Sequence, residues 1–216
     1  MNEEADQGQI MDRGTERDLI ERALAGDRAA AGDLIRGHQA SVYAYLLRMS
    51  GRPYLAEDLA QEAFVRVLSN LHRFDFRYRF STWLFTIARR LYLNAAQKCR
   101  PVYDSEIVSG AGVWYDGDQC EAEARRVCRD VLQDGLMGLS EVQREIIVLF
   151  HQLDWSIALI AQHLDMPEGT VKSHLHRGRR KLRRLLMEQP GAADRLDLVS
   201  LGVDNERVSR GGGGRP

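Results

Sequence analysis

The 216-residue sequence has little cysteine, no long apolar run and no excess of either charge sign, with 30 basic and 31 acidic residues. No stretch approaches the roughly 18 apolar residues that a membrane-spanning helix needs, so we expect no membrane insertion. The first residues are polar and acidic and lack the apolar core of a signal peptide. These absences exclude the membrane, secreted and collagen-like classes and predict a globular protein of the cytoplasm.

The three cysteines, Cys99, Cys120 and Cys128, show neither the spacing of a zinc site nor that of a disulfide framework. Free thiols are the favoured interpretation, and redox pairing of Cys120 with Cys128 is the alternative. Because these two lie eight residues apart on an expected helix, about 12 Å along its axis, a bridge requires the helix to open. The sequence also lacks a catalytic grouping and a Walker-type phosphate loop, so it predicts no enzyme, no metal and no cofactor.

Acidic and basic residues are sorted into separate blocks along the chain, which the net charge of −1 conceals. Residues 1–12 and 102–124 contain acidic residues but no lysine or arginine. In contrast, residues 73–100 contain seven basic residues against Asp75 alone, and residues 170–187 contain seven and no acid. Locally basic segments in a neutral protein indicate a directed contact with a polyanion.

Apolar residues recur with helical spacing almost throughout and alternating strand patterns are absent, so we predict an all-α protein. The periodicity fails between Cys99 and Gln119, where proline, glycines and acidic residues favour a linker. The expected fold is two small helical bundles joined by an acidic linker, the second bundle containing a helix-turn-helix. The predicted parts are an acidic flexible N-terminus (1–17), a first bundle (18–100), the linker (101–120), a second bundle (121–188) and a disordered tail (189–216).

The helix-turn-helix is predicted at the end of the second bundle. Ser140 and Gln143 form a capping-box pattern that starts one helix, a short helix is expected over 156–164, and a long helix follows the turn 165–167. One arc of the long helix is apolar and the opposite arc is basic. A merely solvated helix usually mixes charges for i,i+4 pairing, so an acid-free basic arc favours a helix that enters the major groove of DNA.

Position along the long helix divides its polar residues into two expected roles. The residues near its start are expected to reach base edges: Lys172, Ser173 and Arg177. Those further back suit phosphates: Arg180, Arg183 and Arg184. His174 and His176 point in directions about 200° apart on a helix, so they are not expected to share a metal ion.

Aromatic side chains alternate with arginines between residues 72 and 83, a combination that binds single-stranded nucleic acid through stacked bases and paired phosphates. For Phe80 and Trp83 core packing is the better interpretation, whereas for residues 76–79 core packing and nucleic-acid contact are equally open. The following helix adds residues suited to duplex or phosphate contact: Arg89, Arg90, Asn94 and Lys98.

These elements occur in the order found in the extracytoplasmic-function group of bacterial sigma factors, which the chain resembles. The segments DLAQEAFVRVLSNL, from Asp58, and FSTWLFTIARR, from Phe80, are similar to region two of that family. The segment LSEVQREIIVLFHQLDWSIALIAQHLDMPEGTVKSHLHRGRRKL, from Leu139, is similar to region four. Together the two regions cover most of residues 18–188.

The resemblance implies that the chain binds core RNA polymerase and promoter DNA, and that an anti-sigma factor controls it. It implies a polymerase contact at the residues matching the family's DLxQE motif: Asp58, Gln61 and Glu62. It implies that the first bundle opens the downstream promoter element with Arg77, Tyr78, Arg79, Ser81, Thr82, Trp83, Arg89, Arg90 and Asn94. It implies that the second bundle reads the upstream element with Lys172, Ser173, His174, Arg177 and Arg180.

The linker is long enough for this division of labour. About 20 extended residues reach on the order of 70 Å, or about two turns of DNA. The main alternative is a stand-alone helix-turn-helix regulator, which leaves the Asp58 face and the aromatic stretch without a role. One departure from the family is an apolar pair, Ala158 and Leu159, where its members usually carry acids. Core packing is favoured for Leu159, and a partner contact is the alternative.

Overall fold

The computed structural model describes residues 11–98 and 129–188, and the described residues form helices without strands. The all-α prediction is therefore confirmed for the part of the chain that the structure describes. The predicted linker (101–120), the predicted tail (189–216) and the three cysteines lie outside these ranges, as do residues 1–10 of the predicted flexible N-terminus (1–17). Residues 13–17 of that N-terminus are instead helical, because Asp12 caps a helix that begins at Arg13. In the described ranges no helix is both long and apolar enough to cross a bilayer.

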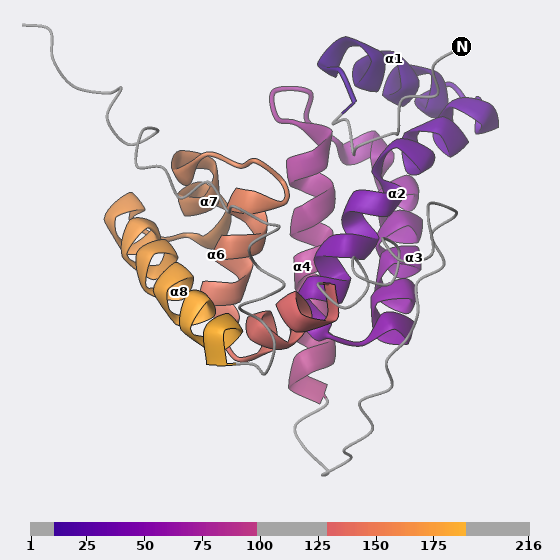
Figure 1. Cartoon of the computed structure of the whole chain (residues 1–216). Coiled ribbons are helices and arrows are strands. Elements are labelled where there is room, and N and C mark those ends of the chain that lie inside the picture. The colour runs from indigo at the N-terminus through magenta and orange to yellow at the C-terminus, as the bar shows by residue number, and fades with distance from the viewer. Residues whose placement is uncertain (1–10, 99–128, 189–216) are drawn as a thin grey trace, which may run out of the picture.

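The first bundle consists of α1 (Arg13–Leu24), α2 (Arg28–Ser50), α3 (Pro53–Ser69), the short 3₁₀ helix η1 (Leu71–Arg73) and α4 (Phe80–Lys98) (Figure 1). Aspartate side chains start the first two helices, since Asp12 and Asp27 each accept hydrogen bonds from two backbone amides of the first turn. Gly51 ends α2 in the left-handed conformation, with φ 69°, and Pro53 starts α3 where no amide is needed.

The second bundle consists of helical residues 129–137, α6 (Glu141–His151), α7 (Ile157–Leu164) and α8 (Glu168–Glu188). The predicted capping box is confirmed, because Ser140 and Gln143 exchange side-chain and backbone hydrogen bonds at the start of α6. Asp165 lies between α7 and α8 with φ 53°, and this tight turn completes the predicted helix-turn-helix. Leu159 is partly buried and packs against the core, as the favoured interpretation expects.

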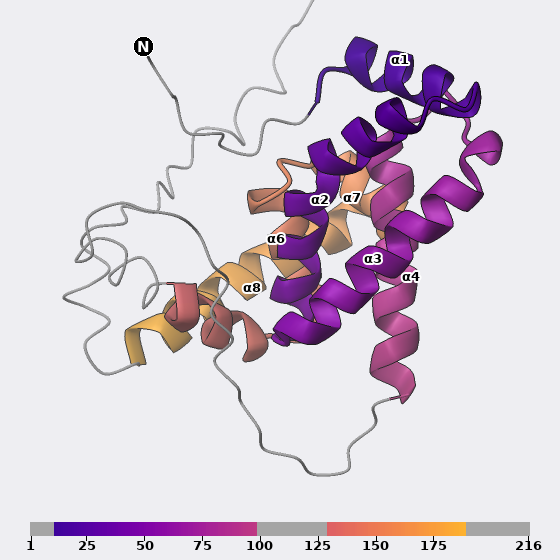
Figure 2. The ribbon, with the colours of Figure 1, turned by 90° about the vertical axis from the view of Figure 1, so that its right-hand side faces the viewer.

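The two bundles pack against each other, with α6 beside α2 (Figure 2). At the centre of this contact the buried Glu145 Oε1 accepts hydrogen bonds from the Tyr45 hydroxyl at 2.9 Å and from Arg89 Nε at 2.7 Å. We call these three residues the clasp. Tyr45 lies on α2, Arg89 on α4 and Glu145 on α6, so the clasp joins both bundles.

Two further contacts surround the clasp. The last carbonyls of α2 accept hydrogen bonds from the second bundle, where Gln133 Nε2 donates to the Leu47 oxygen at 3.2 Å and Arg144 donates to the Met49 oxygen. The Leu47 oxygen also accepts a hydrogen bond from the Gly51 amide at 2.8 Å, so the second bundle adds to the capping of the end of α2. On α4, the Phe85 ring meets the Trp155 ring edge-on with centroids 5.9 Å apart.

Candidate nucleic-acid interface

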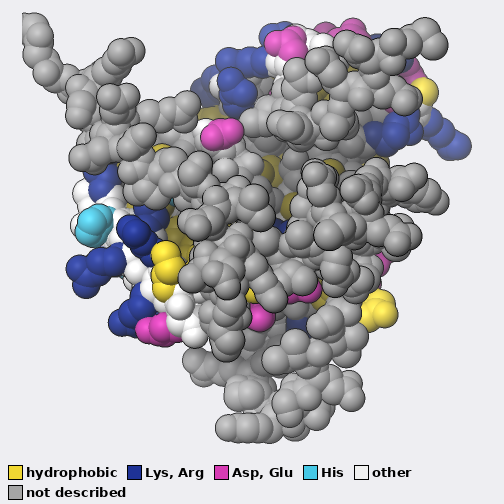
Figure 3. All heavy atoms as spheres, in the orientation of Figure 1, with side chains coloured by type: hydrophobic (Ala, Val, Ile, Leu, Met, Phe, Trp, Pro, Cys, Tyr) yellow, Lys and Arg dark blue, Asp and Glu magenta, His cyan; other side chains and the backbone are white. Residues whose placement is uncertain are grey.

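Helix α8 presents its basic side to solvent and buries its apolar side, as its sequence predicts. The buried side contains Val171, Leu175, Gly178 and Leu186. The exposed side contains Lys172, Ser173, Arg177, Arg180, Arg183 and Arg184. Figure 3 shows Lys and Arg side chains gathered over α8 at the left of the molecule. A rigid helix with one cationic face matches the electrostatic requirement for DNA binding.

The acidic residues at the two ends of α8 form only weak ion pairs with its basic residues. Lys172 Nζ lies 3.6 Å from Glu168, and Arg184 Nε lies 3.7 Å from Glu188, with all four side chains more than half exposed. Exposed i,i+4 pairs of this kind contribute little free energy, so phosphates can replace them. His174 is half-buried, and its Nδ1 atom is buried without a hydrogen bond from any described residue.

Arg179 makes contacts between helices that the sequence pattern did not single out. Its Nε donates to His151 Nε2 at 3.0 Å, and its guanidinium lies 5.0 Å from the centre of the Phe150 ring. Arg179 therefore links α8 to the end of α6. Only its position on the helix, between the apolar and basic arcs, could have indicated this role.

The loop between η1 and α4 is built on an aromatic cluster centred on Phe74. The Phe74 ring lies 5.2 Å from Phe76, 5.7 Å from Phe80 and 5.5 Å from Trp83, measured between centroids. Phe80 is buried and Trp83 half-buried, so both serve the core as favoured from the sequence. These rings fix the loop that displays the exposed side chains of Arg77, Tyr78 and Arg79, while Ser81 and Thr82 are half-buried at the start of α4.

Arg77 is held in place by Asp75. Its guanidinium donates to the Asp75 carboxylate at 2.6 and 2.8 Å, and its backbone amide donates to the same group at 3.0 Å. These hydrogen bonds keep the pKa of the Asp75 carboxyl below its ordinary value. The guanidinium also lies 5.9 Å from the centre of the Tyr78 ring. A cation and an aromatic ring are thus paired on the exposed rim of the loop.

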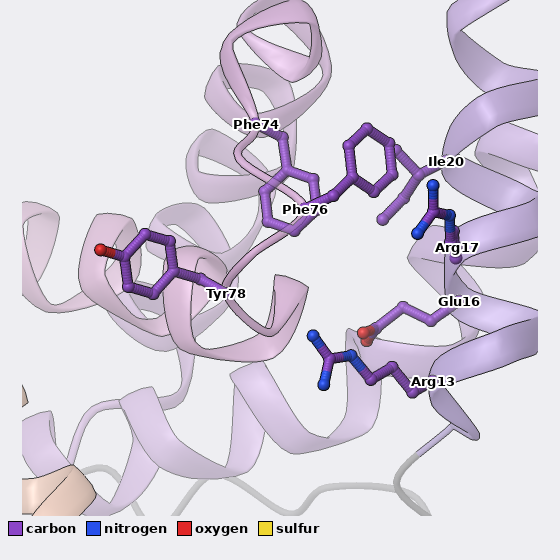
Figure 4. A pocket seen from close by; sticks show the side chains of 7 residues that line it. All are labelled: Arg13, Glu16, Arg17, Ile20, Phe74, Phe76 and Tyr78. Atoms are coloured by element: carbon purple, nitrogen blue, oxygen red, sulfur yellow. The ribbon is translucent and has the colours of Figure 1, made fainter.

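A pocket of about 130 Å³ lies between this loop and α1 (Figure 4). We call it the α1 pocket, and its lining residues are Arg13, Glu16, Arg17, Ile20, Phe74, Phe76 and Tyr78. The Arg17 guanidinium covers the Phe76 ring, 5.1 Å from its centre. Helix α1 thus supplies half of a site that the sequence predicted only from the aromatic stretch.

The expected DNA residues on α4 separate into two environments. Arg90 and Asn94 are exposed, whereas the Arg89 side chain is only 28% exposed and belongs to the clasp. Burial raises the pKa of its partner Glu145, an effect that Arg89 and the Tyr45 hydroxyl oppose. The structure therefore places Arg89 against the second bundle, apart from the other two.

Helix α3 exposes the expected polymerase-contact residues Asp58, Gln61 and Glu62 along one face. Two large apolar side chains extend this face, since Tyr54 is 75% exposed and Val65 is 60% exposed. We call these five residues the α3 face. Exposed aromatic and aliphatic side chains beside charged ones are typical of a protein interface. The sequence could have indicated this face, because Tyr54 and Val65 are apolar residues on the otherwise polar side of the helix.

An exposed recognition helix in one bundle and an aromatic, basic surface in the other define a DNA-binding protein of the helix-turn-helix class. The family model of Sigma-70 region 2 matches residues 34–100, and that of Sigma-70 region 4 matches residues 129–182. The chain is 34% identical over 178 residues to the ECF RNA polymerase sigma factor SigW of Bacillus subtilis, covering 78% of this chain and 95% of SigW. It is 33% identical over 172 residues to SigL of Mycobacterium tuberculosis, covering 78% of this chain and 96% of SigL.

Solved structures agree with this relationship. The sigma factor RpoE from Bartonella quintana, solved with the anti-sigma factor NepR, superposes with a TM-score of 0.58 at 26% identity and covers 74% of this chain and 98% of its own. CnrH, solved with the cytosolic domain of CnrY, has a similar fold, with a TM-score of 0.61 at 22% identity over 82% of this chain and 99% of its own. The chain belongs to the ECF sigma factors, a family of non-enzymatic proteins that direct RNA polymerase to promoters.

Proposed function

We propose that the two bundles of this sigma factor contact separate promoter elements, and that the α3 face binds core RNA polymerase. The proposal depends mainly on α8, the second helix of the helix-turn-helix, which exposes its basic side to solvent and packs its apolar side into the bundle. We assign no catalytic step to the chain itself. We expect it to work in the cytoplasm, where polymerase and promoters are found.

In the upstream contact, α8 enters the major groove. Lys172, Ser173 and Arg177 lie on the first turns and read base edges, with His174 beside them. Arg180 follows about one turn later and binds phosphate. The contact between Arg179 and His151 links α8 to the end of α6 near the middle of α8.

In the downstream contact, the first bundle binds unstacked bases and the adjacent phosphates. The exposed loop residues Arg77, Tyr78 and Arg79 offer a stacking ring between two cations. Arg90 and Asn94 extend the same polar surface along α4. Unstacking costs a few kcal/mol per step, and bases held in protein pockets recover this cost.

The closed arrangement of the bundles does not fit both contacts at once. A compact body of about 150 residues has a diameter of about 40 Å, whereas two turns of DNA span about 70 Å. The bundles therefore separate on the promoter, and the clasp breaks when they do. Separation also frees Arg89 from Glu145, so that Arg89 joins the downstream DNA contact.

An anti-sigma factor is the expected regulatory partner. RpoE from Bartonella quintana was crystallised with the anti-sigma factor NepR. The present chain shares the fold and the family of that protein, and we extend the association to it by this relationship. Co-purification of the chain with the product of a neighbouring reading frame tests the extension, and failure of every neighbouring product to bind would contradict it.

The polymerase contact is tested with the full-length protein and core RNA polymerase in the absence of DNA. We expect Tyr54→Ser and Val65→Ser each to weaken binding about tenfold, because each removes an exposed apolar anchor from the α3 face. Leu24→Ser is the matched control, since Leu24 is also an exposed apolar residue, 44% accessible, but lies on α1. Equal affinities for all four proteins would contradict the assigned surface. Tight binding of the protein alone to a palindromic operator would instead favour a stand-alone regulator.

A further inference from the structure

The contact between His151 at the end of α6 and Arg179 in the middle of α8 depends on the protonation of the histidine. Arg179 Nε donates to His151 Nε2 at 3.0 Å. A guanidinium can only donate hydrogen bonds, so Nε2 is the unprotonated nitrogen and the neutral imidazole carries its proton on Nδ1. A second proton on the imidazole removes the acceptor and sets two cations against each other. The contact therefore exists only while His151 is neutral.

The surroundings of His151 favour the neutral form in the free protein. Partial burial and the charge of Arg179 on α8 lower the pKa of the His151 imidazole, and the charge of Asp154, in the loop after α6, opposes this shift. The neighbouring Phe150 ring, 5.1 Å away between centroids, is uncharged. Because the His151 side chain remains in contact with solvent, it can take up a proton when an anion approaches.

Arg179 lies at the boundary between the buried and the exposed side of α8. At about 100° per residue, Arg179 falls within about 40° of Lys172 and Arg183, two exposed cations, and Leu175 on its other flank is buried. When a helix lies in the major groove, the bases face the centre of its exposed side and the backbone phosphates flank its edges. His151 and Arg179 therefore lie where the helix meets a phosphate rather than a base edge.

We propose that His151 and Arg179 form a phosphate site at the edge of the upstream contact, and that His151 takes up a proton when a DNA phosphate binds there. This inference rests on the proposed entry of α8 into the major groove. The proton comes from the solvent and binds to His151 Nε2, so the Arg179 Nε–H group loses its acceptor. Both cations then donate charge-assisted hydrogen bonds to the phosphate oxygens. The Phe150 ring, 5.0 Å from the guanidinium, keeps Arg179 at this edge during the exchange.

Upstream binding should therefore depend on pH with a defined sign. In the complex the phosphate favours the charged imidazole, whereas in the free protein burial and Arg179 disfavour it. The complex thus binds one more proton than the free protein around pH 6.5, the ordinary pKa of histidine, and affinity falls as pH rises through this window. One proton changes affinity at most about tenfold per pH unit, so we expect about 3- to 10-fold tighter binding at about pH 6 than at about pH 7.5.

The test measures the affinity of the full-length protein with core polymerase for a duplex promoter, at constant ionic strength, between about pH 6 and about pH 7.5. His151→Gln is the main variant, because its amide oxygen can accept the Arg179 hydrogen bond but cannot titrate. We expect the pH dependence of the wild type to exceed that of His151→Gln by about 3- to 10-fold. Comparison with the variant removes the pH response of the polymerase itself.

Two further measurements locate the site. A neutral methylphosphonate replaces each phosphate of the upstream element in turn, and at one position it should reduce the pH dependence of the wild type to that of His151→Gln. In His151→Gln the same replacement should leave the pH dependence unchanged within about twofold. Arg179→Gln should lower the slope of log affinity against log salt concentration by about one unit. Arg36→Gln, which removes an exposed arginine of the first bundle, should retain the full slope.

Each measurement can overturn the proposal. Equal pH dependence in the wild type and in His151→Gln would do so, as would wild-type binding that strengthens relative to the variant as pH rises. A pH difference that no methylphosphonate removes, or an unchanged salt slope in Arg179→Gln, would exclude a phosphate site at these residues. If the wild type formed no promoter-specific complex at any pH, the proposed function itself would fail.

Discussion

Replacement of Glu145 by alanine is the most direct way to loosen the contact between the two bundles. Glu145 is 2% exposed and accepts hydrogen bonds from both Tyr45 and Arg89. Its removal leaves the fully buried Tyr45 hydroxyl without an acceptor, which costs about 1 to 3 kcal/mol. Removing one partner of a buried ion pair costs about 3 to 5 kcal/mol, but the Arg89 side chain is 28% exposed and can regain water.

Together these contributions should destabilise the closed form by about 2 to 3 kcal/mol. Part of the cost is offset because the variant no longer has to bury the charge of the Glu145 carboxylate. At about 1.4 kcal/mol per tenfold, the ratio of open to closed protein should rise roughly 30- to 150-fold. Spin labels on cysteines introduced at Arg36 and Met187, in a background without native cysteines, report this ratio as a distance distribution. Both sites are exposed, and they lie on different bundles.

Asp134→Ala is the matched control for the clasp variant. Asp134 is an exposed acid on the same bundle, so its removal makes an equal change in net charge. Its distance distribution should match that of the wild type. If Glu145→Ala and Asp134→Ala gave the same ratio of open to closed protein, the clasp would have no part in holding the bundles together.

Three other predictions concern the second bundle. Arg177→Ala should reduce base discrimination at one upstream position by about 1 to 3 kcal/mol, whereas Arg184→Ala should weaken binding to all sequences by a similar factor. Affinities measured for a panel of binding sites check this, and uniform losses for both variants would contradict the assigned roles. Gly178→Ala should raise the free energy of unfolding by less than the roughly 1 kcal/mol that alanine gains over glycine in a helix, because the added Cβ would lie 2.9 Å from the tip of the Ile147 side chain and displace it. An added Cβ at Gly169 meets nothing within 4 Å, so Gly169→Ala should keep its gain, and a full gain for Gly178→Ala would refute the close approach. Burial and the nearby charge of Arg89 lower the pKa of His163 to about 4, so the closed form should lose stability as pH falls below about 6.5. The same spin labels should then report an increasing fraction of open protein. The clasp carboxyl titrates in the opposite direction because burial raises its pKa, and a pH response that persists in His163→Gln would contradict the histidine's role.

Local features of this fold could be predicted from the sequence because each depends on neighbouring residues. The capping box at Ser140 and Gln143 and the apolar arc through Val171 and Leu175 follow from spacing alone. The clasp could not be predicted in this way. Tyr45 and Glu145 are 100 positions apart, and a glutamate in a helix is ordinarily solvated, so its burial depends on how the bundles meet.

The candidate site shows the same division. The alternation of aromatic and basic residues left nucleic-acid contact and core packing equally open for residues 76–79, and the structure shows that the loop before α4 rests on a cluster of packed aromatic rings. The contribution of α1 was not predicted, because Glu16 and Arg17 lie about 60 residues before Tyr78, in a polar segment (1–17) for which the sequence predicts a flexible N-terminus. Only the docking of α1 brings them to the loop.

Promoter-specific run-off transcription tests the central claim most directly. Core polymerase alone, core polymerase with the full-length protein, and core polymerase with Arg177→Ala are compared on genomic fragments that contain candidate promoters. We predict discrete transcripts that start at defined sites only when the wild-type protein is present, and weaker or redirected transcripts with the variant. Absence of specific transcripts, although the protein is folded and the polymerase is active with another sigma factor, would contradict the account.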